Sequence, residues 1–331
     1  MTKVLITGSS GHLGEALART LRNLGREFIG IDVAAGEFTT HVGSITDRSF
    51  VRRCMDGVQT VFHAATLHKP HIATHSRQDF VDTNITGTLN LLEEAVTARV
   101  SSFVYTSTTS VFGDAMSPAA GKPAVWVTED LIPIPKNIYG VTKMAAEDLC
   151  QMFHRNSALA CIVLRTSRFF PEDDDNKNVR QEFSSENMKL NEFLHRRVEI
   201  EDVISAHLLA AEKAPAIGFN RYIVSATTPF SAGDVSDLRV DTPGIVRRIF
   251  PDYEEEYARR GWKMLPDIDR VYVNQRIRND LGGQPRYDFK SQVACLAAGE
   301  DLRSPLARII GSKGYHAEKF NDGPYPVEAP V

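Results

Sequence analysis

The chain carries the stretch Thr7-Gly8-Ser9-Ser10-Gly11-His12-Leu13-Gly14 directly after the short apolar run Lys3–Thr7. From His12 to Leu24 the apolar residues recur at helical spacing, so the glycines stand where a strand turns into a helix. Glycine permits a tight turn and a close approach of the backbone to a ligand, and the first turn of a helix offers free N–H groups to an anion. The stretch therefore predicts a strand–turn–helix unit that binds a pyrophosphate.

An acidic residue follows at the place where such a unit contacts a ribose. Asp32 ends the predicted second strand, Glu27–Asp32, about 20 residues beyond the glycines. Its carboxylate would accept hydrogen bonds from the ribose hydroxyls of adenosine and would repel a 2′-phosphate. We therefore predict that the cofactor is NAD and not NADP.

Strand-like and helical segments alternate through the first half of the chain, with a third strand predicted over His41–Ile45, and this alternation is typical of a parallel sheet with crossover helices. We predict an α/β fold of the Rossmann type, a doubly wound parallel sheet, with a smaller C-terminal lobe for the substrate. The NAD-binding Rossmann domain is expected over residues 1–165, completed by about 198–226. The substrate-binding lobe is expected over residues 166–197 and 227–331.

A tyrosine and a lysine stand one helical turn apart in the run Tyr139-Gly140-Val141-Thr142-Lys143, within the predicted helix Asn137–His154. Side chains at this spacing share one face of a helix. A phenol with its reference pKa of ~10 is a poor base, but a nearby ammonium favours the phenolate. Alone, the two residues could be an exposed helix pair. Together with the glycine stretch they indicate nicotinamide redox chemistry.

Further runs make the chain resemble the extended short-chain dehydrogenase/reductase family, which includes NAD-dependent epimerases and dehydratases such as UDP-glucose 4-epimerase. They are Phe62-His63-Ala64-Ala65, Asp82-Thr83-Asn84-Ile85-Thr86-Gly87-Thr88 and Tyr105-Thr106-Ser107-Thr108-Thr109-Ser110-Val111-Phe112-Gly113. The resemblance implies that Thr108 holds the substrate hydroxyl while Tyr139 takes its proton. Ser107 and Thr109 are the alternatives to Thr108. Lys143 would also hydrogen-bond the nicotinamide ribose.

The resemblance also implies the contacts to the cofactor. Asn84 would support the active site, and Ser44 stands where the family often has an aspartate near the adenine. The residues predicted to bind NAD are Gly8, Ser10, Gly11, His12, Leu13, Gly14, Asp32, Ser44, Ile45, His63, Ala64, Ala65, Asn84, Thr106, Tyr139 and Lys143.

The substrate side departs from the family pattern. Leu164–Pro171 resembles a family motif, but Arg168 replaces its substrate-side asparagine, and the segment from Pro171 to Val198 is short for a nucleotide-binding insert. A guanidinium suits recognition of an anion. We predict substrate contacts from His68, Thr108, Thr109 and Arg168.

The residues after the catalytic threonine bear on the reaction. In the 4,6-dehydratases of the family an Asp-Glu pair follows, whereas Thr109 and Ser110 follow here, so dehydration is disfavoured. We expect NAD-dependent oxidation of a secondary alcohol on a sugar or sugar nucleotide, foremost as a nucleotide-sugar epimerase with a transient keto intermediate. The alternatives are an NAD-dependent dehydrogenase of a smaller sugar, polyol or sugar acid, and a non-catalytic NAD-sensing regulatory protein.

Histidines gather in one segment and raise the question of a metal. His63, His68, His71 and His75 could suggest zinc, but no cysteine or carboxylate nearby completes a ligand set, so no metal is predicted. A net charge of -4 over 331 residues indicates neither a nucleic-acid nor a membrane-surface partner.

The remaining expectations concern location and assembly. Four widely spaced cysteines are typical of reduced thiols, and we see no signal peptide or spanning stretch, which predicts a cytoplasmic protein. Apolar residues extend beyond one stripe on the predicted helices Asp79–Thr97 and Asn137–His154. They predict a homodimer that packs these helices against a second copy, with core packing as the alternative.

Overall fold

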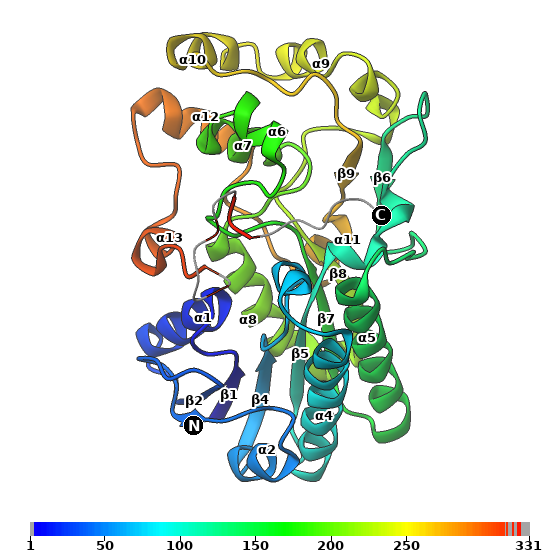
Figure 1. Cartoon of the computed structure of the whole chain (residues 1–331), viewed down its shortest axis with the longest axis vertical. Helices are drawn as coiled ribbons and strands as arrows, with labels where there is room; N and C mark the ends of the chain where they lie inside the picture. The colour runs from blue at the N-terminus through cyan, green and yellow to red at the C-terminus, as the bar shows by residue number, and fades with distance from the viewer. Residues whose placement is uncertain (1–2, 315, 317–319, 321–322, 326–331) are drawn as a thin grey trace.

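The structure, a computed structural model, describes residues 3–314, 316, 320 and 323–325. Its centre is a seven-stranded sheet in the order β3-β2-β1-β4-β5-β7-β8, and every neighbouring pair is parallel (Figure 1). The predicted fold class is confirmed. The strands are β1 (Lys3–Thr7), β2 (Phe28–Asp32), β3 (His41–Val42), β4 (Val58–His63), β5 (Ser102–Thr108), β7 (Cys161–Thr166) and β8 (Phe219–Val224).

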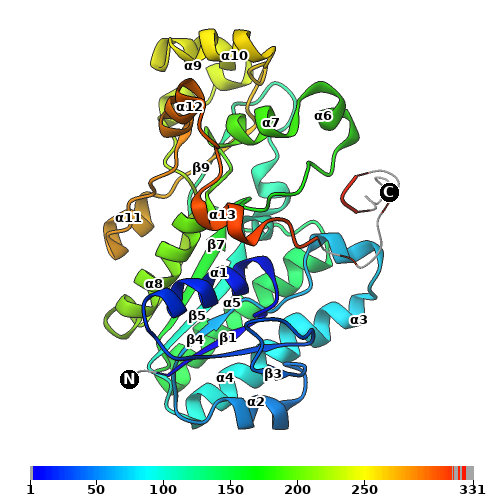
Figure 2. The same ribbon diagram turned by 90° about the vertical axis from the view of Figure 1, so that its left-hand side faces the viewer.

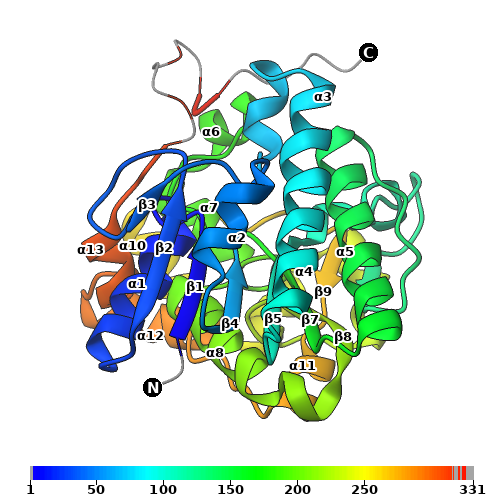
Figure 3. The same ribbon diagram turned by 90° about the horizontal axis from the view of Figure 1, so that it is seen from below.

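Helices cover both faces of this sheet (Figure 3). One face carries α1 (His12–Asn23) and α8 (Ile200–Ile217), and the other carries α2 (Arg48–Cys54), α4 (Gly87–Thr97) and α5 (Ile138–Ser157). Successive strand residues point to opposite faces. Because both faces are covered, the strands are apolar on both sides, as expected for a parallel sheet.

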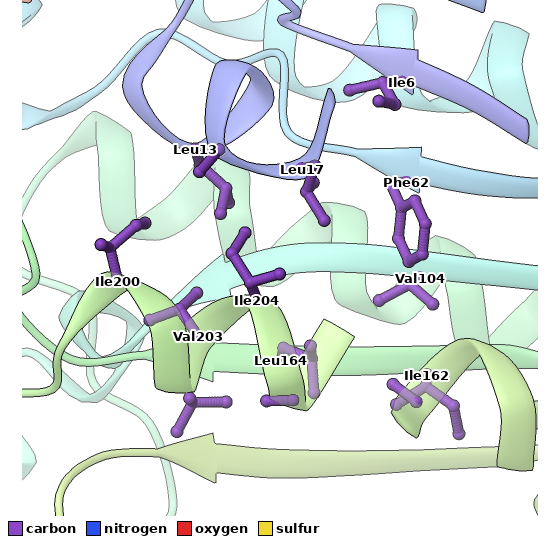
Figure 4. Close-up of a cluster of buried hydrophobic side chains, with 14 of the residues drawn as sticks. Ile6, Leu13, Leu17, Phe62, Val104, Ile162, Leu164, Ile200, Val203 and Ile204 are labelled. Atoms are coloured by element: carbon purple, nitrogen blue, oxygen red, sulfur yellow. The ribbon is translucent and has the colours of Figure 1, made fainter. Parts of the chain in front are cut away.

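The core between the sheet and the α1–α8 layer shows this packing directly (Figure 4). Leu13 and Leu17 of α1 face Ile204 of α8, and all three are buried. Phe62 and Val104 close the cluster from the sheet side. This layer holds the first helix against the strands, so the glycine turn before it has a defined position.

A lobe lies at one end of the sheet (Figure 2). A two-stranded parallel sheet of β6 (Val125–Val127) and β9 (Arg270–Tyr272) belongs to it. A separate apolar cluster holds its helices together.

The other α-helices lie both in the lobe and beside the sheet. Among the described residues they are α3 (Arg77–Phe80), α6 (Lys177–Glu182), α7 (Ser185–Glu192), α9 (Thr242–Ile249), α10 (Tyr253–Arg260), α11 (Gln275–Leu281), α12 (Phe289–Ala298) and α13 (Pro305–Ile310).

Two predicted elements differ from those in the structure. The helix expected over Asp79–Thr97 is interrupted, because a π-helical segment, Val81–Thr86, separates α3 from α4. Single π turns inside helices occur frequently at functional sites. The strand expected over His41–Ile45 spans only His41–Val42 at the sheet edge. Within the described part of the chain, none of the helices has both the length and the apolar character needed to cross a membrane.

Candidate active site

A cavity of about 450 Å³ opens where the strands end and the lobe begins. The glycine turn lines one side of it, and the end of β5 and the start of α5 line another. Ligands of parallel sheets bind in such crevices beyond the carboxyl ends of the strands. The predicted catalytic and glycine-loop residues therefore meet at one site.

The glycine turn is packed so closely against neighbouring backbone that a side chain would not fit at Gly8 or Gly14. Gly8 has a φ of +74°, and a Cβ there would lie 2.8 Å from the backbone nitrogen of Ala65. A Cβ on Gly14 would lie 1.9 Å from the carbonyl oxygen of Gly8. Helix α1 begins at His12 directly behind the turn, so its first N–H groups face the same space. These features fit a dinucleotide pyrophosphate.

Asp32 is held beside this turn. Its Oδ2 accepts a hydrogen bond from the backbone N–H of Ser10 at 3.0 Å, and its Oδ1 accepts one from Ala34 at 2.9 Å. The carboxylate therefore has a defined orientation at the end of β2, which fits a ribose. Ser10, Asp32, Ser44, Ile45 and Ala65 are not among the residues that line the cavity, and the hydroxyl of Ser44 bonds with that of Thr46. The contacts of these residues with NAD stay predictions.

The three predicted catalytic side chains are in mutual reach. Asn137 caps α5 by accepting from the N–H of Gly140 at 3.0 Å, so Tyr139 lies in the first turn. The side chain of Thr108 lies next to its hydroxyl and lowers the pKa of the phenol. Lys143 Nζ donates to the carbonyl oxygen of Thr106 at 2.6 Å.

The two alternatives to Thr108 are engaged elsewhere. The hydroxyl of Ser107 donates to Glu147 at 2.5 Å, and that of Thr109 donates to the carbonyl of Thr166 at 3.4 Å. Both residues line the cavity, but neither hydroxyl is bonded to Tyr139 in the contacts of the described residues. The structure thus favours Thr108 as the partner of the phenol.

Burial controls the charges of the tyrosine and the lysine. It raises the pKa of Tyr139 to about 12, against the opposite effect of the nearby Thr108 side chain, and it lowers the pKa of Lys143 to about 7. In these residues alone, burial outweighs the expected effect of the ammonium on the phenol. An oxidised nicotinamide would supply further positive charge when bound, which favours the phenolate.

Asn84 and His63 build the frame of the site. Asn84 accepts from the N–H of Leu67 at 2.8 Å and donates to Thr142 Oγ1 at 3.0 Å, so it ties a cavity loop to α5. The ring of His63 bonds with Thr7 Oγ1 at 2.8 Å and with a second hydroxyl on α4. Neither residue lines the cavity, whereas Ala64 beside His63 does. Both side chains therefore hold neighbouring strands, helices and loops of the site together and do not themselves face the cavity.

The predicted substrate residues lie on the cavity wall but differ in character. The His68 ring lies 6.1 Å from that of Tyr139 and is uncharged, because burial and the nearby His71 and Lys143 lower its pKa to about 3. Arg168 is paired with Asp174 at 2.7 Å and with Glu192 at 3.3 Å. Its guanidinium is therefore shared with two carboxylates and is less available to a substrate anion than expected.

Several cavity residues have no signal in the sequence. Arg196, Arg270 and Tyr272 reach the cavity from the lobe, and Phe169 and Phe170 line it after β7. Arg196, Arg270 and Tyr272 come from segments without a recognisable motif, so only the long-range packing brings them in. Phe169 and Phe170 lie within the Leu164–Pro171 motif but were not predicted to line the site. Among the described residues, no group of histidine, cysteine and carboxylate side chains could hold a metal ion.

Comparison with known proteins agrees with this geometry. The model of the NAD dependent epimerase/dehydratase family matches residues 4–223. The chain belongs to this family. The predicted extended short-chain dehydrogenase/reductase type, the enzyme class and the cofactor NAD are thereby confirmed.

Individual relatives of this family member are diverse. A 3-beta-hydroxysteroid dehydrogenase of Mycolicibacterium neoaurum is 25% identical over 91% of this chain and 92% of its own length. A UDP-glucose 4-epimerase of Erwinia amylovora is 27% identical, over 49% of this chain and 52% of its own. A short-chain dehydrogenase/reductase superfamily protein of Agrobacterium tumefaciens, solved with bound NAD, is 22% identical with a TM-score of 0.64, covering 93% of this chain and 99% of its own.

Proposed function

We propose that this enzyme oxidises a secondary alcohol of a sugar or sugar nucleotide with NAD and returns the hydride to the other face of the transient ketone, as a nucleotide-sugar epimerase. The observation that carries the proposal is the contact of Thr108 with Tyr139 at the cavity wall, with Lys143 one helical turn further. This arrangement can bind a hydroxyl and remove its proton.

In the proposed reaction the Thr108 hydroxyl orients the substrate hydroxyl toward Tyr139. The phenolate oxygen takes the proton of that hydroxyl, and the carbon–oxygen single bond becomes a carbonyl. The hydride on the same carbon passes to bound NAD, which is the chemistry the cofactor supplies. Among the described residues Lys143 donates one hydrogen bond, to the Thr106 carbonyl, whereas an ammonium can donate three. The remaining donors suit the ribose hydroxyls.

The character of the wall supports a polar substrate. The cavity is lined by charged side chains, among them Lys69, Asp173, Arg196 and Arg270, beside the apolar rings of Phe169 and Phe170. Such groups hydrogen-bond a molecule rich in hydroxyls and disfavour a large apolar one. A sugar suits this wall better than a steroid.

A dehydrogenase is the second candidate. A relative that aligns over nearly the whole chain is named a dehydrogenase, while a relative named an epimerase aligns over about half. The short segment between Pro171 and Val198 also leaves little chain for a nucleotide. A smaller sugar, polyol or sugar acid would then be oxidised with net release of NADH.

One screen separates these candidates. Purified protein is incubated with NAD and a panel of nucleotide sugars, sugars and sugar acids, while absorbance at 340 nm and product composition are followed. An epimer without net NADH supports the proposal, and stoichiometric NADH identifies a dehydrogenase. Tight binding of NAD without turnover on the whole panel would favour the non-catalytic, NAD-sensing alternative.

We further propose a homodimer in the cytoplasm. Val141 on α5 is 48% exposed, and Met144 and Leu149 on the same helix are half-buried, which supports a contact with a second copy. All four cysteines are unpaired, as in a reducing compartment. A monomer mass by light scattering at micromolar concentration would refute the dimer.

A further inference from the structure

A buried carboxylate lies behind the catalytic side chains and has no part in the reaction described so far. Glu147 follows Lys143 by one turn of α5, and its side chain has no exposed surface. Arg165 of β7 pairs with its Oε2 at 2.7 Å, and Arg221 of β8 pairs with the same oxygen at 3.0 Å. Ser107 of β5 donates its hydroxyl to Oε1 at 2.5 Å. One carboxylate thus joins three strands to α5.

The residues on either side of Ser107 both contact the catalytic side chains. Thr106 accepts from Lys143 through its carbonyl oxygen, and the Thr108 side chain lies next to the phenol of Tyr139 and lowers its pKa. Ser107 lies between them in the sequence, and its side chain points to the α5 face of the sheet, where it donates a hydrogen bond to Glu147. Any shift of Ser107 therefore moves the acceptor of the lysine and the partner of the tyrosine together.

The charge of Glu147 also acts on Lys143. Burial lowers the pKa of Lys143 to about 7, and the Glu147 carboxylate is the foremost effect in the opposite direction. The other groups around the ammonium are Cys150 on α5, the Tyr105 ring on β5 at 4.2 Å, and the uncharged histidines His63 and His68. Among the described residues, Glu147 is the one carboxylate whose charge raises the pKa of Lys143.

We propose that Glu147 is a positioning residue of the reaction: through Ser107 it fixes the strand that carries Thr108, and it supplies the negative charge that Lys143 faces. The inference rests on the proposed function, because it concerns the same catalytic side chains. A purely structural ion pair would need only the contacts to the two arginines. The bond to Ser107 and the place one turn behind Lys143 add a link to the chemistry.

The sign of the charge effect can be worked out. Lys143 is an ammonium below its pKa and is neutral above it. Without the carboxylate the ammonium loses its counter-charge, so its pKa falls further and the ammonium disappears at lower pH. Replacing Arg221 removes a positive charge from the same cluster and leaves Glu147 less neutralised, so the pKa of Lys143 moves up. The two replacements thus predict opposite shifts.

The test uses NADH as the probe, because no substrate is then required. NADH is titrated into wild type, Glu147→Gln and Arg221→Gln, and its fluorescence reports binding. The titrations are repeated at pH values from about 5.5 to about 9, within the range in which each protein stays folded. In wild type the affinity should fall as the pH rises through the pKa of Lys143. The midpoint of that fall should move to lower pH in Glu147→Gln and to higher pH in Arg221→Gln. Lys143→Met is the control, in which the fall should be absent.

Two outcomes would overturn the proposal. If both variants move the midpoint in the same direction, or neither moves it, Glu147 is only a structural ion pair. If Glu147→Gln does not fold, Arg221→Gln alone must still show the upward shift.

Ser107→Ala tests the positioning link. With a substrate from the screen, its kcat should fall by up to about 100-fold, and NADH affinity should fall as well because the acceptor of Lys143 shifts, while the pH midpoint stays that of wild type because the Glu147 charge remains. An unchanged kcat would refute the link. Failure of the sugar screen would refute the proposed function but would leave the NADH titration decisive.

Discussion

Replacing Tyr139 by phenylalanine tests the proposed chemistry most directly. The ring is 7% exposed and packs near His68, and phenylalanine keeps that packing. The variant loses only the hydroxyl and its interaction with the nearby Thr108 side chain, so the free energy of unfolding should fall by only about 1 kcal/mol. It also loses the group that takes the alcohol proton, so turnover should fall by roughly 10²–10⁴-fold.

The assay follows from where the other contacts lie. The pyrophosphate and ribose contacts are expected at the glycine turn and at the end of β2, so the NAD dissociation constant of Tyr139→Phe should stay within a few-fold of wild type, on the order of 1 kcal/mol or less. Turnover is measured on the substrate found by the screen, and NAD binding by calorimetry. Near-normal turnover would refute the mechanism, and His68 or a non-catalytic role would then need examination.

Three further replacements have defined outcomes. Asp32→Ala should narrow the preference for NAD over NADP by about 1–3 kcal/mol, because the carboxylate held by Ser10 no longer meets a 2′-phosphate; equal binding of both cofactors to wild type would contradict this. Lys143→Met should weaken both turnover and NAD binding, and a loss of turnover alone would argue against the ribose contact. Gly14→Ala should lower the melting temperature and NAD affinity, since its Cβ would overlap the carbonyl of Gly8; wild-type values of both would show that the turn can relax.

The residues close together in the sequence were predictable, because their geometry depends on local hydrogen bonds. The glycine turn joins β1 to α1 within a few residues, and Tyr139 and Lys143 share a face of α5 through helical periodicity alone. Alternating apolar segments likewise determine a parallel sheet with helices on both faces. The family motifs then placed Thr108 at the end of β5, beside the tyrosine.

Other features were decided by contacts between distant segments. The sequence indicated an uninterrupted helix over Asp79–Thr97, but the packing of Asn84 between a cavity loop and α5 accompanies a π turn there. Arg168 stands where substrate contacts were expected, yet the folded chain brings Glu192 and Asp174 to its guanidinium. The periodicity of one segment carries no information about which charge will face it from another.

The buried cluster around Glu147 shows the same division most clearly. Its position one turn after Lys143 is visible in the sequence, and so is the motif that contains Arg165. That Arg165, Arg221 and Ser107 converge on it depends on the strand order β5-β7-β8, which no local pattern determines. Hydrogen bonds within a turn of helix follow from nearby residues, whereas buried ion pairs between a helix and two strands form only once the helix has packed on the sheet and water is excluded from them.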